Sequence, residues 1–161
     1  MSAGNPGSEL VCLEPSVLDR DTSQSYGHAG AMVPLLTPWM PGPAEANGAP
    51  ILVSVTDFHA DQRRELLGVA LHGGRMRMGW YGMQGAIGLW LWSLPVNSRS
   101  GSISVWASED DLERFIGLPH HVDIMKRYGP RGTVRSTRWQ ADTFDRHAVV
   151  ERAREWITEA S

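Results

Sequence analysis

The sequence has little cysteine, no long apolar run and no excess of charge of one sign, and each shortage excludes a class of protein. Cys12 is the only cysteine among 161 residues, which excludes a disulfide framework and a cysteine-based zinc site. The longest apolar run, Ala86 to Leu94, is about half of the ~18–20 residues that cross a bilayer. The N-terminus lacks a basic stretch followed by an apolar one, and the net charge of −3 does not favour a general nucleic-acid binder. We therefore expect a cytoplasmic protein that binds neither membranes nor nucleic acids.

Glycine and proline divide the chain into two parts. Residues 1–48 are rich in both and acidic, with Arg20 as the single base, a composition typical of an irregular arm. The apolar stretch at 31–41 contains three prolines that exclude a helix, so we expect it to dock as an extended strap. Residues 49–161 carry regular hydrophobic patterns and are expected to form one domain.

Runs of β-branched and apolar residues alternate with amphipathic stretches in the second part. We expect strands at 51–56, 86–93, 102–106 and 133–139, and helices at 59–71, 109–116, 119–128 and 145–160. Asp57 is the expected N-cap of the first helix, and Gly73-Gly74 its expected end. Ser108 is the expected N-cap of the second helix, whose first turn is acidic.

This order of elements, β-α-β-β-α-β followed by a helix, predicts a ferredoxin-like α+β fold. The fold has an antiparallel sheet with helices on one face, here joined by an extra C-terminal helix and the irregular N-terminal arm. The other face of the sheet needs a cover, which predicts a homodimer. The alternative is a monomer in which the N-terminal strap covers that face.

A histidine and a methionine share one face of the third expected helix. His121 and Met125 are four residues apart, and a histidine there suits a base, a hydrogen-bond anchor or a metal ligand. The alternative is a structural histidine, and a ring that faces solvent or is capped by a backbone carbonyl would remove most of the support for the catalytic interpretation. Neighbouring His120 is expected to face solvent, because adjacent helical residues point about 100° apart.

Tryptophans and one arginine complete the candidate site. Trp90 and Trp92 share a strand face, while Trp106 and Trp139 end two other strands. Together they predict an aromatic-lined pocket for a flat hydrophobic ligand, with core packing as the alternative. An inward Arg138 is suited to bind a carboxylate or a phenolate oxygen, with a surface ion pair as the alternative.

By order of elements over residues 49–144, and by residue motif over about 104–139, the chain resembles the dimeric α+β barrel superfamily, in the branch of antibiotic-biosynthesis monooxygenase-like proteins and spheroidene monooxygenase. The resemblance rests on a strand ending S-x-W-x-S, an acidic helix start, and then a phenylalanine, a histidine and a methionine. The matching positions are Ser104, Trp106, Ser108, Phe115, His121 and Met125. The resemblance implies a two-layer α+β fold and a range of activities that includes oxygenases, cyclases and dehydratases.

On this basis we expect a small-molecule enzyme of secondary metabolism that acts on a hydrophobic or aromatic substrate. The alternatives are a non-oxidative cyclase, of the polyketide cyclase type, and a non-catalytic ligand-binding or dimerisation module. The expected catalytic residues are His121 and Arg138, and no metal site is expected. The expected substrate-binding residues are Trp90, Trp92, Trp106, Phe115, Met125 and Trp139. No cofactor is expected, and haem with His121 as its ligand is the alternative.

Overall fold

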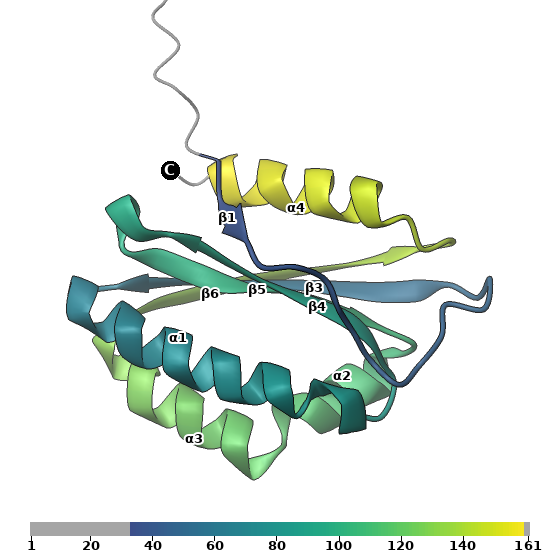
Figure 1. Ribbon diagram of the computed structural model, residues 1–161, viewed down its shortest axis with the longest axis horizontal. Helices are drawn as coiled ribbons and strands as arrows, with labels where there is room; N and C mark the ends of the chain where they lie inside the picture. Colours follow the sequence, from purple (N-terminus) through teal and green to yellow (C-terminus); the bar gives the residue numbers. More distant parts are fainter. Residues whose placement is uncertain (1–32, 160–161) are drawn as a thin grey trace, which may run out of the picture.

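A computed structural model describes residues 33–159, which form a sheet with helices on both faces (Figure 1). The predictions for residues 1–32, Cys12 among them, and for Ala160 lie outside the described residues. The strands are β1 (Leu35–Leu36), β2 (Met40–Pro41), β3 (Ile51–Ala60), β4 (Ala86–Leu94), β5 (Arg99–Trp106) and β6 (Gly132–Ala141). The helices are α1 (Arg63–Met78), α2 (Glu109–Ile116), α3 (Pro119–Tyr128) and α4 (Arg146–Glu159), and the short 3-10 turns are η1 (Trp80–Gly82), η2 (Pro95–Asn97) and η3 (Gly129–Arg131).

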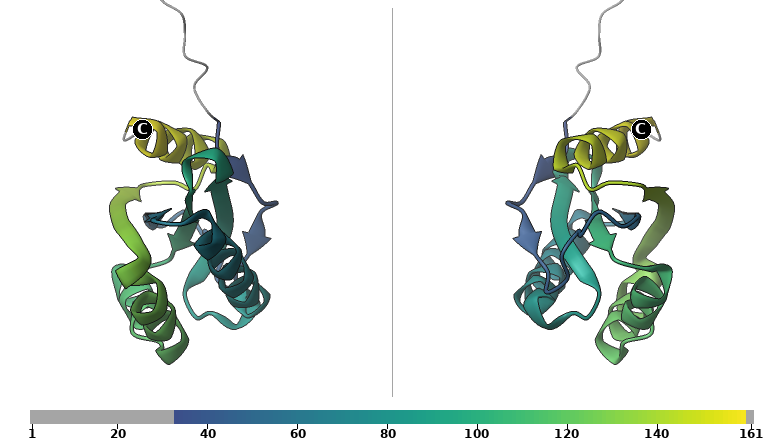
Figure 2. Two further views of the ribbon diagram at one scale, coloured as in Figure 1. Left: turned by 90° about the vertical axis from the view of Figure 1, so that its left-hand side faces the viewer. Right: turned by 90° about the vertical axis from the view of Figure 1, so that its right-hand side faces the viewer.

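The sheet confirms the predicted ferredoxin-like topology. Its four long strands are antiparallel in the order β4-β5-β3-β6, and both β1 and β2 pair with the outer edge of β4. Helices α1, α2 and α3 lie on one face of the sheet, while α4 lies on the opposite face (Figures 1 and 2). Among residues 33–159, no helix is both long enough and apolar enough to cross a membrane.

The apolar strap forms an interrupted edge strand, as its three prolines predicted. Leu35 pairs with Ser93 and Met40 with Leu89, so β1 and β2 lie in line along β4 with Pro38 between them. Proline has no backbone N–H for a ladder, and an edge strand tolerates this loss. The boundary expected after residue 48 therefore divides the strap from the rest of the sheet in sequence, but the strap and the domain at 49–161 share one sheet.

Helix α4 and the strap cover the face for which the sequence analysis found no cover. Val149, Ala153 and Ile157 of α4 are buried against the apolar residues of that face, such as Val53 and Val55. From the strap, Trp39 packs on Trp90 with ring centroids 4.2 Å apart and on Phe144 at 5.4 Å. The cover is thus supplied within one chain. The homodimer stays a prediction, but the uncovered sheet face on which it was based is covered by α4 and the strap.

Both predicted ends of the first helix were wrong. Asp57 is not an N-cap, because β3 continues to Ala60 by pairing with both β5 and β6, and the helix begins at Arg63. Gly73-Gly74 lies inside α1, which ends at Met78. The other elements match their predictions within a few residues, and Ser108 caps α2 by accepting a hydrogen bond from the N–H of Asp111 at 3.2 Å.

Asp57 instead holds a buried charge cluster beneath the C-terminal end of α4. Its Oδ2 accepts hydrogen bonds from Arg99 Nη2 and Arg135 Nε, both at 2.6 Å. Arg99 also donates to the carbonyl of Ile157 at 2.7 Å, and Arg135 stacks over the Trp156 ring at 4.0 Å. The two guanidiniums therefore satisfy backbone carbonyls at the end of α4, where positive charge is favourable.

Candidate functional site

The face of the sheet toward α1, α2 and α3 has two apolar ends and a polar middle. One end is built around Trp80, Trp106 and Leu112, and the other around Phe58 and Tyr128. We call the space between this face and the three helices the helix-side layer. Because side chains alternate along a strand, the register of β3, β4, β5 and β6 decides which of them face this layer.

Three aromatic rings and an imidazole pack together at the first end. The ring centroids of Trp80 and Trp106 are 5.1 Å apart, and those of Trp106 and Phe115 are also 5.1 Å apart. Phe115 in turn lies 4.8 Å from the ring of His121. Helix α2 brings Phe115 over the sheet, and the break at Gly117 and Pro119 tips α3 so that His121 reaches the same cluster.

His121 is half-buried, and one of its two ring nitrogens is already in use. Its Nδ1 lies 3.2 Å from the carbonyl oxygen of Ile116, an acceptor, so Nδ1 carries the proton and Nε2 has a free lone pair. Burial lowers the pKa of His121, the hydrogen bond to Ile116 opposes this shift, and the neighbouring His120 adds to it. The ring is therefore neutral at about pH 7, with a basic nitrogen available. The contact to Ile116 is also the carbonyl cap expected of a structural histidine.

The predicted substrate-binding residues lie on two different faces. Trp90 and Trp92 belong to the core under α4, and Trp139 packs against that core. Trp106 and Phe115 face the helix-side layer instead. The reason is register, because Trp106 pairs with Leu52 while Trp90 pairs with Ile103, and these partners point to opposite faces. The structure therefore does not bring the four strand tryptophans into one pocket.

Met125 and Arg138 lie at the rim of the helix-side layer. The Met125 side chain is 40% exposed, although it shares a helix with His121. Arg138 is on the correct face of β6, opposite Ser54, but its Nη1 donates to Glu113 at 2.6 Å and lies 3.5 Å from Glu109. Its surface ion pair is the alternative that the sequence left open.

The polar middle of this face is a feature that the sequence analysis missed. It is a group of adjacent hydroxyls, which we call the hydroxyl row: Ser54 and Thr56 of β3, Ser102 and Ser104 of β5, and Ser136 of β6. The signal was present as serine or threonine at alternate positions of 51–58 and 99–106, a pattern usually typical of a face toward solvent. Here α1 and α3 lie on the same face of the sheet (Figures 1 and 2), although Ser136 stays exposed.

The helices cover this face only in part. None of the residues of α1 is buried, and Tyr128 is the only buried residue of α3. Thr56 and Ser102 remain half-buried although they lie at the centre of the sheet. Leu66 and Val69 of α1 pack, partly buried, on the end of the face built around Phe58 and Tyr128, so the helix contacts the sheet there.

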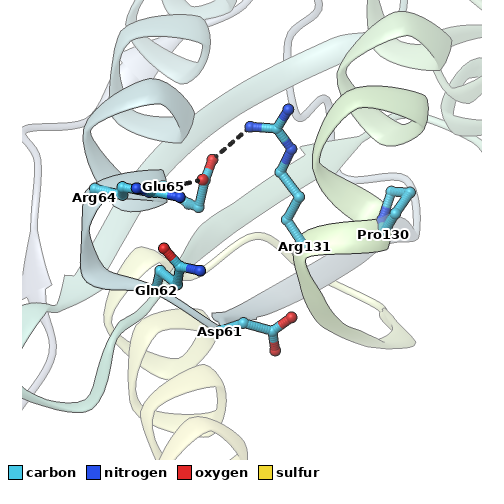
Figure 3. A pocket seen from close by; sticks show the side chains of 6 residues that line it. All are labelled: Asp61, Gln62, Arg64, Glu65, Pro130 and Arg131. Carbon is cyan, nitrogen blue, oxygen red and sulfur yellow. Dashed lines mark hydrogen bonds and ion pairs between the residues drawn. The ribbon is translucent and has the colours of Figure 1, made fainter.

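Two surface depressions lie elsewhere. One, of about 330 Å³, is polar and lies between the start of α1 and η3, where Arg131 donates to Glu65 at 2.9 Å (Figure 3). This ion pair lowers the pKa of Glu65. The other, of about 190 Å³, lies beside Leu35 and Val96. Neither contains a predicted site residue.

Few side chains in the described residues could bind a metal ion or haem. Within residues 33–159, no three histidine, cysteine or acidic side chains gather as a metal site would require. Haem needs only one histidine ligand, and Nε2 of His121 is the nitrogen that would supply it.

Comparison with known proteins gives matches by structure alone. No family model matches the chain, and neither does any curated protein. A conserved protein from Methanosarcina mazei is 10% identical with a TM-score of 0.50, over 60% of this chain and 96% of that one. A proposed monooxygenase from Lactobacillus acidophilus is 14% identical with a TM-score of 0.51, over 68% of this chain and 50% of that one.

A third match is SnoaB, a cofactor-independent oxygenase from Streptomyces nogalater, which is 16% identical with a TM-score of 0.48 over 58% of this chain and 94% of that one. Identities this low establish the fold and not the chemistry. The chain has the ferredoxin-like α+β fold that it shares with these solved structures.

Proposed function

We propose that this chain is a small-molecule enzyme of the monooxygenase-like type that acts on a hydrophobic or aromatic substrate in the helix-side layer. The observation that carries the proposal is the half-buried His121, whose ring packs on Phe115 beside the partly accessible polar middle of this face. A ligand that entered there would meet the partly accessible Phe115 on one side and the hydroxyls of Thr56 and Ser102 beneath. The similarity in fold to a proposed monooxygenase is consistent with this choice.

In this proposal His121 is the base. Its free Nε2 accepts a proton from an acidic C–H or O–H of the substrate, while Nδ1 stays bonded to Ile116 and fixes the ring. The substrate anion then reacts with dioxygen or closes a ring on itself, and Trp106 and Phe115 limit the access of water. Arg138 is a rim residue here, since Glu113 already neutralises its charge.

A second function, a non-catalytic binding module, is favoured by one observation. The hydrogen bond from His121 to Ile116 also satisfies a carbonyl at the C-terminal end of α2, which a purely structural histidine would do. Such a module would use the same layer but would not need the lone pair on Nε2.

Replacement of His121 by asparagine tests the proposal. In His121→Asn the amide nitrogen takes the place of Nδ1 and keeps the bond to Ile116, but the basic Nε2 is lost. We expect this variant to fold normally and to lose turnover of any substrate found by screening aromatic compounds, measured by oxygen uptake and product analysis. His120→Asn, at an exposed neighbour, is the matched control and should keep full turnover. Full turnover by a folded His121→Asn would leave the binding module as the better account.

The expectation that no cofactor is needed belongs to the same proposal. It is tested by the visible absorption spectrum of the purified protein. A spectrum without bands in the visible region agrees with the proposal, whereas a Soret band that disappears in His121→Gln would establish haem ligation instead.

A further inference from the structure

We propose that the solvent-facing side of α1 is a docking surface for residues 9–21 of this same chain, which we call the acidic segment. This surface lies on the side of α1 away from the sheet, at the outside of the molecule (Figures 1 and 2). It shares no residue with the proposed enzyme site, so the two proposals are independent.

Three large apolar side chains form a line along the outside of α1. Leu67 is 77% exposed, Leu71 is 58% exposed and Met78 is 73% exposed. Their spacing of four and then seven residues places them on one side of the helix. Gly74 lies on the same line, and a Cβ at this position would contact nothing. We call these four residues the outer stripe. Scattered apolar side chains are common on protein surfaces, whereas an aligned group marks an interaction surface.

The outer stripe takes no part in the packing of α1 on the sheet. Leu66 and Val69, on the opposite side of the helix, make that contact with the cluster around Phe58 and Tyr128. The exposed apolar residues of the stripe are therefore not explained by the fold of residues 33–159.

Positive charge flanks the outer stripe on both sides. At about 100° per residue, two arginines of α1 fall on each side of it: Arg63 and Arg77 on one, Arg64 and Arg75 on the other. The only acid of α1, Glu65, is 14% exposed and accepts a hydrogen bond from Arg131 at 2.9 Å. Apart from Arg64, which lies 3.6 Å from Glu65, the four arginines form no ion pair among residues 33–159. A second copy of α1 would bring like charges together, so the surface favours an acidic occupant.

The acidic segment has the complementary composition. It contains every acid, leucine and valine of residues 1–32: Glu9, Leu10, Val11, Leu13, Glu14, Val17, Leu18, Asp19 and Asp21. Its single base is Arg20. The residues on either side, 1–8 and 22–32, contain no Asp, Glu, Lys or Arg and are rich in Gly and Ser, a composition typical of linkers. Apolar and acidic residues are thus concentrated in one stretch that matches an apolar stripe between arginines.

The described chain begins beside the first turn of α1. Val33 and Val96 line one depression, and the carbonyl of Val96 accepts a hydrogen bond from Arg63 at 3.1 Å. Near the other end of the helix, Arg77 donates to the carbonyl of Pro38 at 2.9 Å. The strap that follows the acidic segment in sequence therefore runs beside α1.

The connection is long enough for docking anywhere on the outer stripe. Residues 22–32, between the acidic segment and the strap, span up to about 36 Å when extended. The 16 residues of α1 extend over about 24 Å. The acidic segment therefore reaches the whole length of α1 while the strap stays paired with β4.

Disulfide trapping in the full chain tests the proposal. Cys12 lies within the acidic segment and is the only cysteine of the chain, so one cysteine added on α1 reports their contact. Ala70 is exposed and lies beside the outer stripe, three residues after Leu67, which makes Ala70→Cys a suitable variant. We expect its intrachain disulfide with Cys12 to form under mild oxidation about tenfold faster than in a chain whose segment has lost its four acids. Those acids are replaced by amides in Glu9→Gln, Glu14→Gln, Asp19→Asn and Asp21→Asn.

Two further variants separate docking from chance contact. Ala148→Cys is the matched control, an exposed alanine on α4 across the sheet, and its trapping rate should not depend on the four acids. Leu67→Gln combined with Leu71→Gln removes the apolar part of the surface and should slow trapping in Ala70→Cys. Both leucines are exposed, so these changes leave the packing of α1 on the sheet intact.

Three results would overturn the proposal. The first is a trapping rate in Ala70→Cys that is the same with and without the four acids, or that falls equally in Ala148→Cys. The second is a disulfide-linked product of twice the chain mass in place of the intrachain one, which would assign the outer stripe to a second copy. The third is flotation of the full chain with phosphatidylserine vesicles that is lost in Leu67→Gln, which would assign the stripe to an anionic membrane.

Discussion

Removal of the charge on Asp57 should destabilise the protein more than removal of any surface carboxylate. Asp57 is 2% exposed and forms two contacts of 2.6 Å, to Arg99 and Arg135. The Arg99 side chain is 6% exposed, while that of Arg135 is 32% exposed. In Asp57→Asn the shape is kept but the negative charge is lost, so the positive charge of Arg99 stays buried with less compensation.

The structure sets the size of the expected loss. Removal of one partner from a buried ion pair costs about 3–5 kcal/mol. Arg99 keeps its hydrogen bond to the Ile157 carbonyl at 2.7 Å, and the amide oxygen of the substituted side chain still accepts one hydrogen bond, which favours the lower end of that range. We therefore expect a loss of about 3 kcal/mol in the free energy of unfolding.

Urea denaturation followed by tryptophan fluorescence measures this loss. With a denaturant slope of about 1.5–2 kcal/mol per molar, the midpoint should fall by about 1.5–2 M. Glu113→Gln is the control for an exposed pair, since the Glu113 side chain is 55% exposed, and it should cost less than about 1 kcal/mol. Equal losses in the two variants would refute the claim that the cluster under α4 stabilises the fold through buried charge.

Two further predictions concern other parts of the molecule. Burial lowers the pKa of His121 from its ordinary 6.5, so as the pH falls the imidazole is protonated in the unfolded chain before it is protonated in the folded one. The free energy of unfolding should therefore decrease as the pH falls below about 6.5. His121→Asn should flatten this dependence in urea titrations at several pH values. A pH dependence unchanged by that substitution would show that other groups cause it. Gly88→Ala should displace Trp39, because a Cβ at Gly88 would overlap the Trp39 ring; we expect a loss of about 1–3 kcal/mol in thermal or urea unfolding, and an unchanged stability would mean that the strap does not pack as described.

Local signals predicted most of the fold. Ser108 and the acidic residues after it predicted the start of α2, and the three prolines predicted an extended strap, because caps and prolines act through their own backbone. The start of α1 was different, since β3 is prolonged to Ala60 by ladders with β5 and β6, and strand pairing over long sequence distances leaves no local signal.

The candidate site was predicted in part, and register explains the remainder. The grouping of Trp106, Phe115 and His121 is local to β5, α2 and α3, and the structure brings these residues together. The separation of Trp90 from Trp106 depends on which residues of β3, β4 and β5 lie opposite one another. The hydroxyl row was missed for a related reason, because alternating serine and threonine resembles a solvent-facing strand until a helix is known to cover it.

The most direct test of a ligand site in the helix-side layer is methyl NMR of the full chain with and without a naphthalene diol as an aromatic probe. Thr56, Val69 and Ile124 lie on the helix side of the sheet, whereas Thr137 and Ile157 lie on the α4 side. We predict ligand-induced shifts of the first three methyl signals and none for the last two. Shifts confined to Thr137 and Ile157, or absent from both sets at saturating diol, would contradict the account.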